Sequence, residues 1–94
     1  MTTDMTACIP KDAVRASIHD SGIVLFHTQK GRLFAANSAG ACIWQGLERR
    51  LPIDAIVSEV SQRYRIAEET ARIDAVRFIS ELERERLVSP MVQR

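Results

Sequence analysis

The chain has 94 residues, of which 46% are hydrophobic, and its formal net charge is +1. These values describe one globular domain with a single modest core, and they exclude a strongly basic arm that binds nucleic acid by charge alone. No apolar run approaches the roughly 18 residues that span a membrane, and no signal peptide opens the chain, so we expect a cytoplasmic protein.

Three strands are predicted in the first part of the chain. Residues 13–18 alternate apolar and polar side chains, residues 23–28 form an apolar run rich in strand formers, and residues 32–36 follow a turn with Gly31. This pattern is typical of antiparallel strands, the last two joined as a β-hairpin. Because three short strands leave at least one edge unpaired, residues 32–36 are the candidate edge.

Three helices are predicted in the rest of the chain. Asn37 and Ser38 suit the N-cap of a helix that ends near Arg50, and Pro52 suits the first position of the second helix. The third helix is predicted over residues 67–86. Three strands followed by three helices give an α+β fold, with a three-stranded antiparallel sheet packed on a three-helix bundle.

The third predicted helix has more apolar residues than one buried face needs. Ile73 and Val76 lie to one side of its core face, three residues apart and adjacent on the helix surface. Either the buried stripe is wide, or the helix has a second, accessible apolar strip. The residues predicted to form the core face are Ala71, Ala75, Phe78, Ile79 and Leu82.

No group of residues forms a recognisable active site. The histidines, His19 and His27, and the cysteines, Cys8 and Cys42, lack the spacing of metal ligands, and we expect two free thiols. His27 ends a strand, where it is expected to be exposed or to cap the hairpin. No nucleophile has a base beside it, and the glycines form no phosphate-binding loop. The sequence therefore predicts no catalytic residue, no metal site and no cofactor.

Several segments together resemble the PqqD family. The strand–turn–strand segment from Gly22 to Phe34 is followed by N-x-x-G-x-x-I-W over residues 37–44 and by D-x-x-x-F-I-x-x-L over residues 74–82. The resemblance covers residues 13–88. The flanking segments are expected to be a disordered or extended N-terminus over residues 1–12 and a C-terminal tail over residues 89–94.

The resemblance implies a winged-helix-like fold and a non-catalytic function. Members of the family bind the leader region of a ribosomally made precursor peptide and present it to a modifying enzyme, which is a radical S-adenosylmethionine enzyme or a leader protease. The leader adds as a strand to the third strand and lies against the third helix. Carried over to this chain, the peptide-binding residues are Arg32, Leu33, Phe34, Ala35 and Ala36 on the strand, and Arg72, Ile73, Val76, Arg77 and Ser80 on the helix.

Three details belong to this expectation. The helix positions are chosen by their face, because the family motif does not specify them one by one. Leu33 and Phe34 point to opposite faces of a strand, so only one of them can face the peptide. Ala36 stands where the family usually has a larger apolar residue, which changes either the core or the width of the cleft.

Other functions stay open at this stage. A winged helix can bind nucleic acid, but residues 67–86 carry six acidic and four basic side chains, a poor match for a phosphate-lined groove. The chain can also be a structural subunit of an enzyme complex that makes no contact with a peptide. An exposed strand edge can pair with a second copy of the chain, which leaves a homodimer open.

Overall fold

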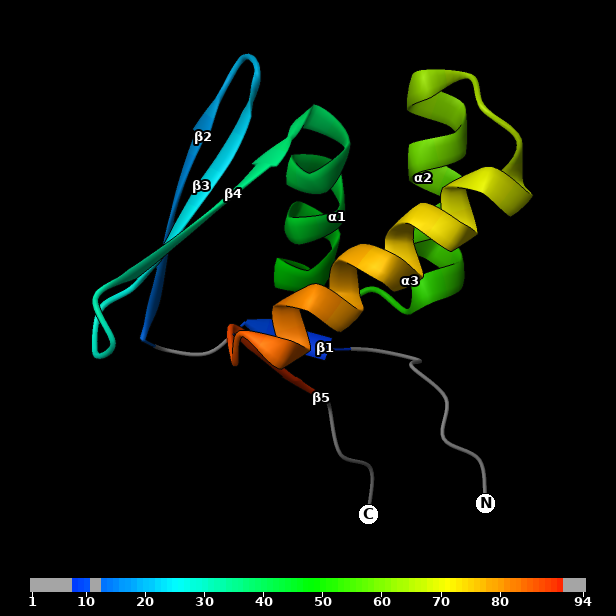
Figure 1. Ribbon diagram of the computed structural model, residues 1–94. Helices are drawn as coiled ribbons and strands as arrows, with labels where there is room; N and C mark the ends of the chain where they lie inside the picture. The colour runs from blue at the N-terminus through cyan, green and yellow to red at the C-terminus, as the bar shows by residue number, and fades with distance from the viewer. Residues whose placement is uncertain (1–7, 11–12, 91–94) are drawn as a thin grey trace.

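The computed structural model describes residues 8–10 and 13–90 (Figure 1). Every predicted strand and helix is present, with bounds that differ by one or two residues, and the α+β fold class is confirmed. Two further short strands, which the sequence analysis did not predict, pair with each other. The elements are β1 (Cys8–Pro10), β2 (Val14–His19), β3 (Gly22–His27), β4 (Arg32–Asn37), α1 (Ser38–Glu48), α2 (Ile53–Tyr64), α3 (Glu68–Arg84) and β5 (Val88–Pro90).

The main sheet is antiparallel and has the order β2-β3-β4. In its register, Leu25 of β3 lies opposite Ala16 of β2 and Phe34 of β4. Within the described part of the chain, β4 pairs with β3 alone. The prediction that residues 32–36 form a sheet edge is therefore confirmed.

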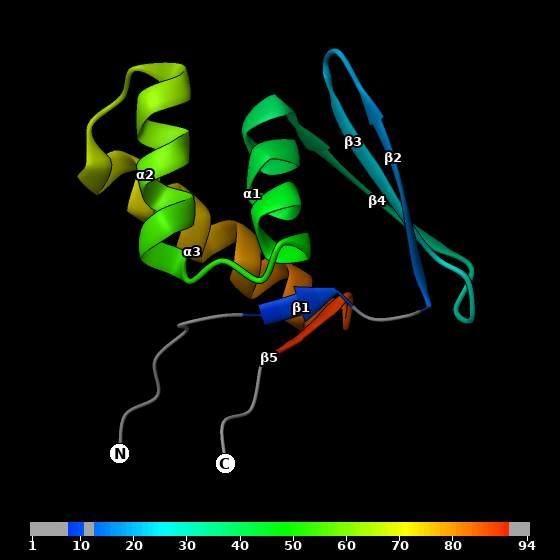
Figure 2. The ribbon, with the colours of Figure 1, turned by 180° about the vertical axis from the view of Figure 1, so that it is seen from behind.

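The two faces of this sheet differ in burial. Ile23 and Leu25 point inward, pack against α1 and are buried in the core. Phe26 and Leu33 face each other across β3 and β4 on the outer side, where their exposed fractions are 38% and 70%. No described element covers that outer face in either view (Figures 1 and 2).

The turn of the β3–β4 hairpin depends on the positive φ of Gly31 and on a hydrogen bond to the side chain of His27. Gly31 has φ 65°, which suits glycine because it has no Cβ, and its N–H donates to the His27 carbonyl at 2.8 Å. His27 is buried, and its Nδ1 accepts a hydrogen bond from the backbone N–H of Lys30 at 3.2 Å. Of the two roles expected for His27, exposed or capping the hairpin, the structure shows the capping role.

Replacing Gly22 by alanine should destabilise the fold by about 2 kcal/mol. Gly22 has φ 156°, and an added Cβ would lie 2.1 Å from the backbone oxygen of Ala36. The matched variant Gly31→Ala should cost about 1 kcal/mol, because its φ is also positive but no atom lies within 4 Å of the added Cβ. Urea unfolding of both variants checks the order; equal costs would contradict the close contact at Ala36.

The helices form a layer beside the sheet. α1 lies between the sheet and α2, and α3 crosses both of the other helices (Figure 2). Asn37 caps α1, since its side-chain oxygen accepts from the N–H of Gly40 at 3.0 Å. Pro52 was expected at the first helical position but is the N-cap of α2, with an extended ψ of 161°. The largest fully buried side chains are Trp44, Ile23, Leu25, Ile43, Leu47, Ile56, Ile79, Leu82, Val57 and Val60.

The core face of α3 agrees with the prediction except at one position. Ala71, Ala75, Ile79 and Leu82 are buried, whereas Phe78 is only half-buried. Phe78 lies at the margin between the core and the gap that separates α3 from β4. Its position makes it a wall residue of the cleft described below.

The small second sheet joins the two ends of the described chain. β1 and β5 pair in antiparallel fashion, with Cys8 opposite Pro90 and Pro10 opposite Val88. β1 also contacts α1 and β5 contacts α3, so the pair lies beneath the helices (Figure 1). What the sequence predicted for residues 1–7, 11–12 and 91–94 lies outside the described residues.

Candidate functional site

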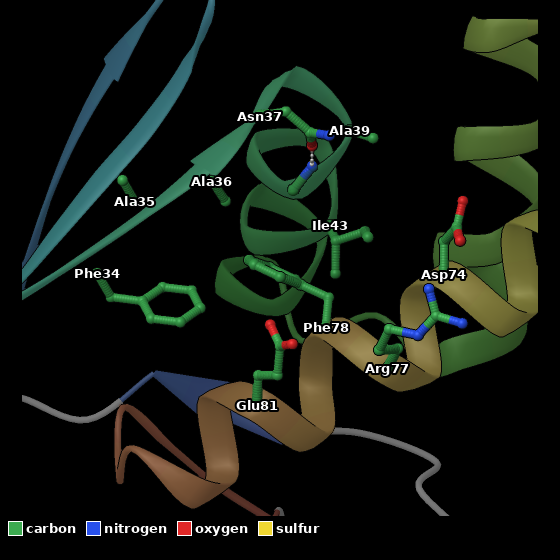
Figure 3. A pocket seen from close by; sticks show the side chains of 11 residues that line it. Phe34, Ala35, Ala36, Asn37, Ala39, Ile43, Asp74, Arg77, Phe78 and Glu81 are labelled. Carbon is green, nitrogen blue, oxygen red and sulfur yellow. Dashed lines mark hydrogen bonds between the residues drawn. The ribbon is translucent and has the colours of Figure 1, made fainter.

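A cleft lies between the free edge of β4 and helix α3, with the first turns of α1 as its floor (Figure 3). Its volume is about 310 Å³. The floor is apolar and so is the strand wall apart from Asn37, while the helix wall carries three charged side chains. The lining residues are Phe34, Ala35, Ala36, Asn37, Ala39, Gly40, Ile43, Asp74, Arg77, Phe78 and Glu81.

Gly40 allows the three elements to meet at the floor of the cleft. A Cβ added at this position would lie 2.7 Å from the Cβ of Ala36 and 3.3 Å from the ring of Phe78. Both contacts are closer than carbon atoms normally allow, so α1 approaches β4 and α3 this closely only with glycine here. Gly40 thus serves close packing between the three elements. Together with Ala36 and Ala39, it leaves a recess above Ile43.

Two contacts join β4 to α3 on the side of the cleft nearer the β3–β4 turn. The rings of Phe34 and Phe78 have centroids 5.9 Å apart and an interplanar angle of 43°, a tilted arrangement that favours aromatic attraction. Further toward the turn, the Arg32 guanidinium pairs with the Glu85 carboxylate at 2.9 Å. The recess therefore narrows from Ala36 toward Arg32.

Three charged residues of α3 line the cleft without a partner. Asp74, Arg77 and Glu81 form no side-chain hydrogen bond or ion pair with any residue in the ranges that the structure describes. Glu81 is half-buried, and in Figure 3 its carboxylate points between the rings of Phe34 and Phe78. Three other arginines of the described chain do form ion pairs, among them Arg49 with Glu59 at 2.7 Å. The cleft thus presents charged groups without a protein partner beside an apolar floor.

The strand residues predicted for the site divide by face. Phe34 and Ala36 face the cleft, and Arg32 lies at its narrow end. Ala35 borders the cleft as well, although by alternation its side chain is on the same face as Leu33. Leu33 is on the outer face of the sheet and does not line the cleft. Of the neighbouring pair that the sequence left open, Phe34 is therefore the residue that faces the cleft.

Of the helix residues predicted for the site, only Arg77 lines the cleft. Ile73 and Val76 are exposed, at 52% and 37%, and do not contribute to the lining. Arg72 pairs with Asp54 of α2 at 2.8 Å, and Ser80 is half-buried outside the lining. At 3.6 residues per turn, Val76 lies about 160° around the helix from Asp74. The accessible apolar strip exists, but it belongs to another face of α3.

Asp74, Phe78 and Glu81 line the cleft but were not predicted as site residues. Their spacing with Arg77, at positions i, i+3, i+4 and i+7, is that of one helical face. Because three of the four are charged, a search for an apolar face passes over them.

The described residues offer little reactive chemistry. Cys42 is a free thiol, and burial raises its pKa, so it packs as a small neutral side chain. Among residues 8–10 and 13–90, no three side chains of histidine, cysteine, aspartate or glutamate are grouped closely enough to hold a metal ion. None of the described helices is both long and apolar enough to cross a membrane.

Comparison with known proteins finds two solved structures with this fold. A chain in "TbiB1 in Complex with the TbiA(beta) Leader Peptide" superposes with a TM-score of 0.80 at 27% identity, covering 90% of this chain and 99% of that one. A chain in "Lasso peptide synthetase B1 complexed with the leader peptide" has a TM-score of 0.78 at 18% identity, covering 88% and 98%. At that lower identity the second likeness shows the fold alone. No curated protein matches the sequence.

The family described as "Coenzyme PQQ synthesis protein D (PqqD)" matches residues 22–88. This range runs from the first residue of β3 to the first residue of β5 and includes every residue that lines the cleft. The match confirms the resemblance read from the sequence motifs. The chain belongs to the PqqD family.

Proposed function

We propose that this protein binds the leader segment of a ribosomally made precursor peptide by adding it as a strand to β4. The observation that carries the proposal is the position of the free β4 edge, which forms one wall of an apolar cleft. An unpaired edge offers N–H and C=O groups that bind any extended peptide, and the cleft beside it selects side chains. The similar TbiB1 was solved with a leader peptide, which supports this use of the fold.

The proposed site combines the strand with the cleft face of α3. The six residues of β4 span about 20 Å, enough to pair with a segment of similar length. Arg32 to Ala36 supply the edge, and the helix wall consists of Arg77, which was predicted, with Asp74, Phe78 and Glu81. Binding is proposed to occur without turnover, so the protein presents the peptide rather than modifying it.

The proposed partner is the enzyme that acts on the precursor. A radical S-adenosylmethionine enzyme or a leader protease would receive the peptide held at β4. The leader tethered in the cleft would raise the local concentration of the rest of the precursor near that enzyme. Co-purification with such an enzyme in the absence of peptide affinity would instead favour a purely structural subunit.

An NMR titration tests the proposal. Synthetic peptides that cover the short reading frames beside the gene are added to ¹⁵N-labelled protein. We expect chemical-shift changes concentrated at residues 32–37 and 74–81, with peptide resonances in extended conformation. Changes concentrated elsewhere, or no binding by any of these peptides, would overturn the proposed function. A duplex DNA titrated at low salt tests the nucleic-acid alternative in the same assay.

A further inference from the structure

The charge and the size of the cleft select a particular leader sequence, and this inference rests on the proposed function. We infer that the bound segment carries a bulky apolar side chain and, two residues away, a lysine or arginine. The apolar side chain fills the recess above Ile43, and the basic side chain pairs with Glu81. Glu81 is thus a specificity-determining residue of the site.

The recess explains the apolar part of this pattern. Ala36, Ala39 and Gly40 are all small, and they surround the space between β4, α1 and α3. The side chain of a peptide residue that pairs opposite Ala36 points inward, because residues paired across neighbouring strands lie on the same face of a sheet. A small side chain there would leave the recess unfilled and forfeit the gain from apolar burial. A large apolar side chain is therefore favoured at this position.

Glu81 accounts for the lysine or arginine in the inferred peptide pattern. It lies one turn beyond Phe78 along α3 and one turn before Glu85, so it faces the cleft between the Phe34–Phe78 contact and the Arg32–Glu85 ion pair. Glu85 already has Arg32 as its partner, whereas Glu81 has none among the described residues. A carboxylate at the mouth of an apolar cleft is stabilised by an incoming cation.

The spacing of the pattern follows from the strand. Inward-facing side chains of a strand recur every second residue, about 6.6 Å apart. Ala36 and Phe34 are two such positions on β4, and the next one toward the turn is Arg32. A peptide residue paired opposite Phe34 points inward beside the Phe34–Phe78 contact, where the Glu81 carboxylate points (Figure 3). The apolar and basic side chains are therefore separated by a single intervening residue.

Arg77 and Asp74 add a second, weaker preference. They lie on the cleft face of α3 on the far side of Phe78 from Glu81. Because they carry opposite charges three residues apart, their net field on a peptide side chain is small. Arg77 is also one helical turn from Glu81, but in Figure 3 its guanidinium points toward Asp74 and away from Glu81, so Glu81 determines the sign of the preference.

Selection from random linear peptides displayed on phage tests the inference. The wild-type protein should enrich peptides with a bulky apolar residue, any residue, and then a lysine or arginine, read in either direction. The variant Glu81→Lys should enrich aspartate or glutamate at the basic position, and Glu81→Gln should lose the charge preference. Ala36→Leu, which fills the recess, should lose the preference for a bulky apolar residue.

Affinities of synthetic peptides give the size of the effect. A basic peptide recovered with the wild-type protein should bind Glu81→Lys about fivefold more weakly, which corresponds to about 1 kcal/mol, and an acidic version of that peptide should recover the loss. Glu69→Lys, a charge reversal at an exposed position in the first turn of α3, should leave the affinity unchanged.

The outcomes separate this inference from the proposed function. If the wild-type protein and both Glu81 variants select the same charge, the role of Glu81 is overturned while peptide binding stands. If the wild-type protein enriches no peptide and binds none of the gene-neighbourhood peptides, the proposed function itself fails, and this inference fails with it.

Discussion

Replacing Phe34 by glutamate should weaken the binding of a leader peptide at least tenfold. Phe34 lines the cleft and contacts Phe78, so the new carboxylate would stand where an apolar side chain of the peptide is expected. Burying it there without a partner costs more than about 1.4 kcal/mol, which is a factor of ten in affinity. Isothermal titration with the peptide identified by NMR measures the change.

The neighbouring variant Leu33→Glu is the matched control. It introduces the same charge into the same strand, but Leu33 points to the outer face and is 70% exposed. Affinity should stay within about twofold of the wild-type value. A loss of equal size in both variants would mean that the new charge acts on the β4 backbone, or that the peptide does not enter the cleft. Circular dichroism establishes that both variants are folded.

Replacing Trp44 by alanine should cost about 3–5 kcal/mol of stability, the largest effect expected for a single core residue. Trp44 is 1% exposed and lies in α1, the helix that packs against both the sheet and α2. A domain of this size has a total stability of about 5–15 kcal/mol, so the variant should lose roughly 15–30 °C in Tm. Differential scanning calorimetry measures the shift.

The variant Trp44→Phe separates packing from hydrogen bonding. It keeps an aromatic ring but removes the Nε1–H that donates to the Glu48 carboxylate at 3.0 Å. That loss should add about 1 kcal/mol to the cost of the smaller ring. If Trp44→Ala is no less stable than Trp44→Phe, the ring is not a main support of the core.

The main elements could be predicted because each has a local signal. Alternation marks β2, the turn with Gly31 marks the β3–β4 hairpin, and Asn37 marks the start of α1. The β1–β5 pair has no such signal. Its strands are three residues each and lie at opposite ends of the described chain, so only the packed helices bring them together.

The strand side of the cleft could be predicted from the sequence, whereas its helix side could not. Three short strands leave an unpaired edge, and residues 32–36 do form an edge of the sheet. The face of α3 that meets β4 depends on how the helix is rotated about its axis, and periodicity identifies only its buried face. Ile73 and Val76 are accessible, as the pattern indicated, yet the rotation brings Asp74, Phe78 and Glu81 to the cleft instead.

Because the outer face of the sheet is uncovered, the domain can select only some of the side chains of a bound leader. A strand paired with β4 would point every second side chain away from the cleft, into the space beside Leu33. These outward-pointing side chains of the peptide would contact neither α1 nor α3. The side chains on that half of a bound segment would therefore not be selected by the cleft, and they would stay accessible to a second protein.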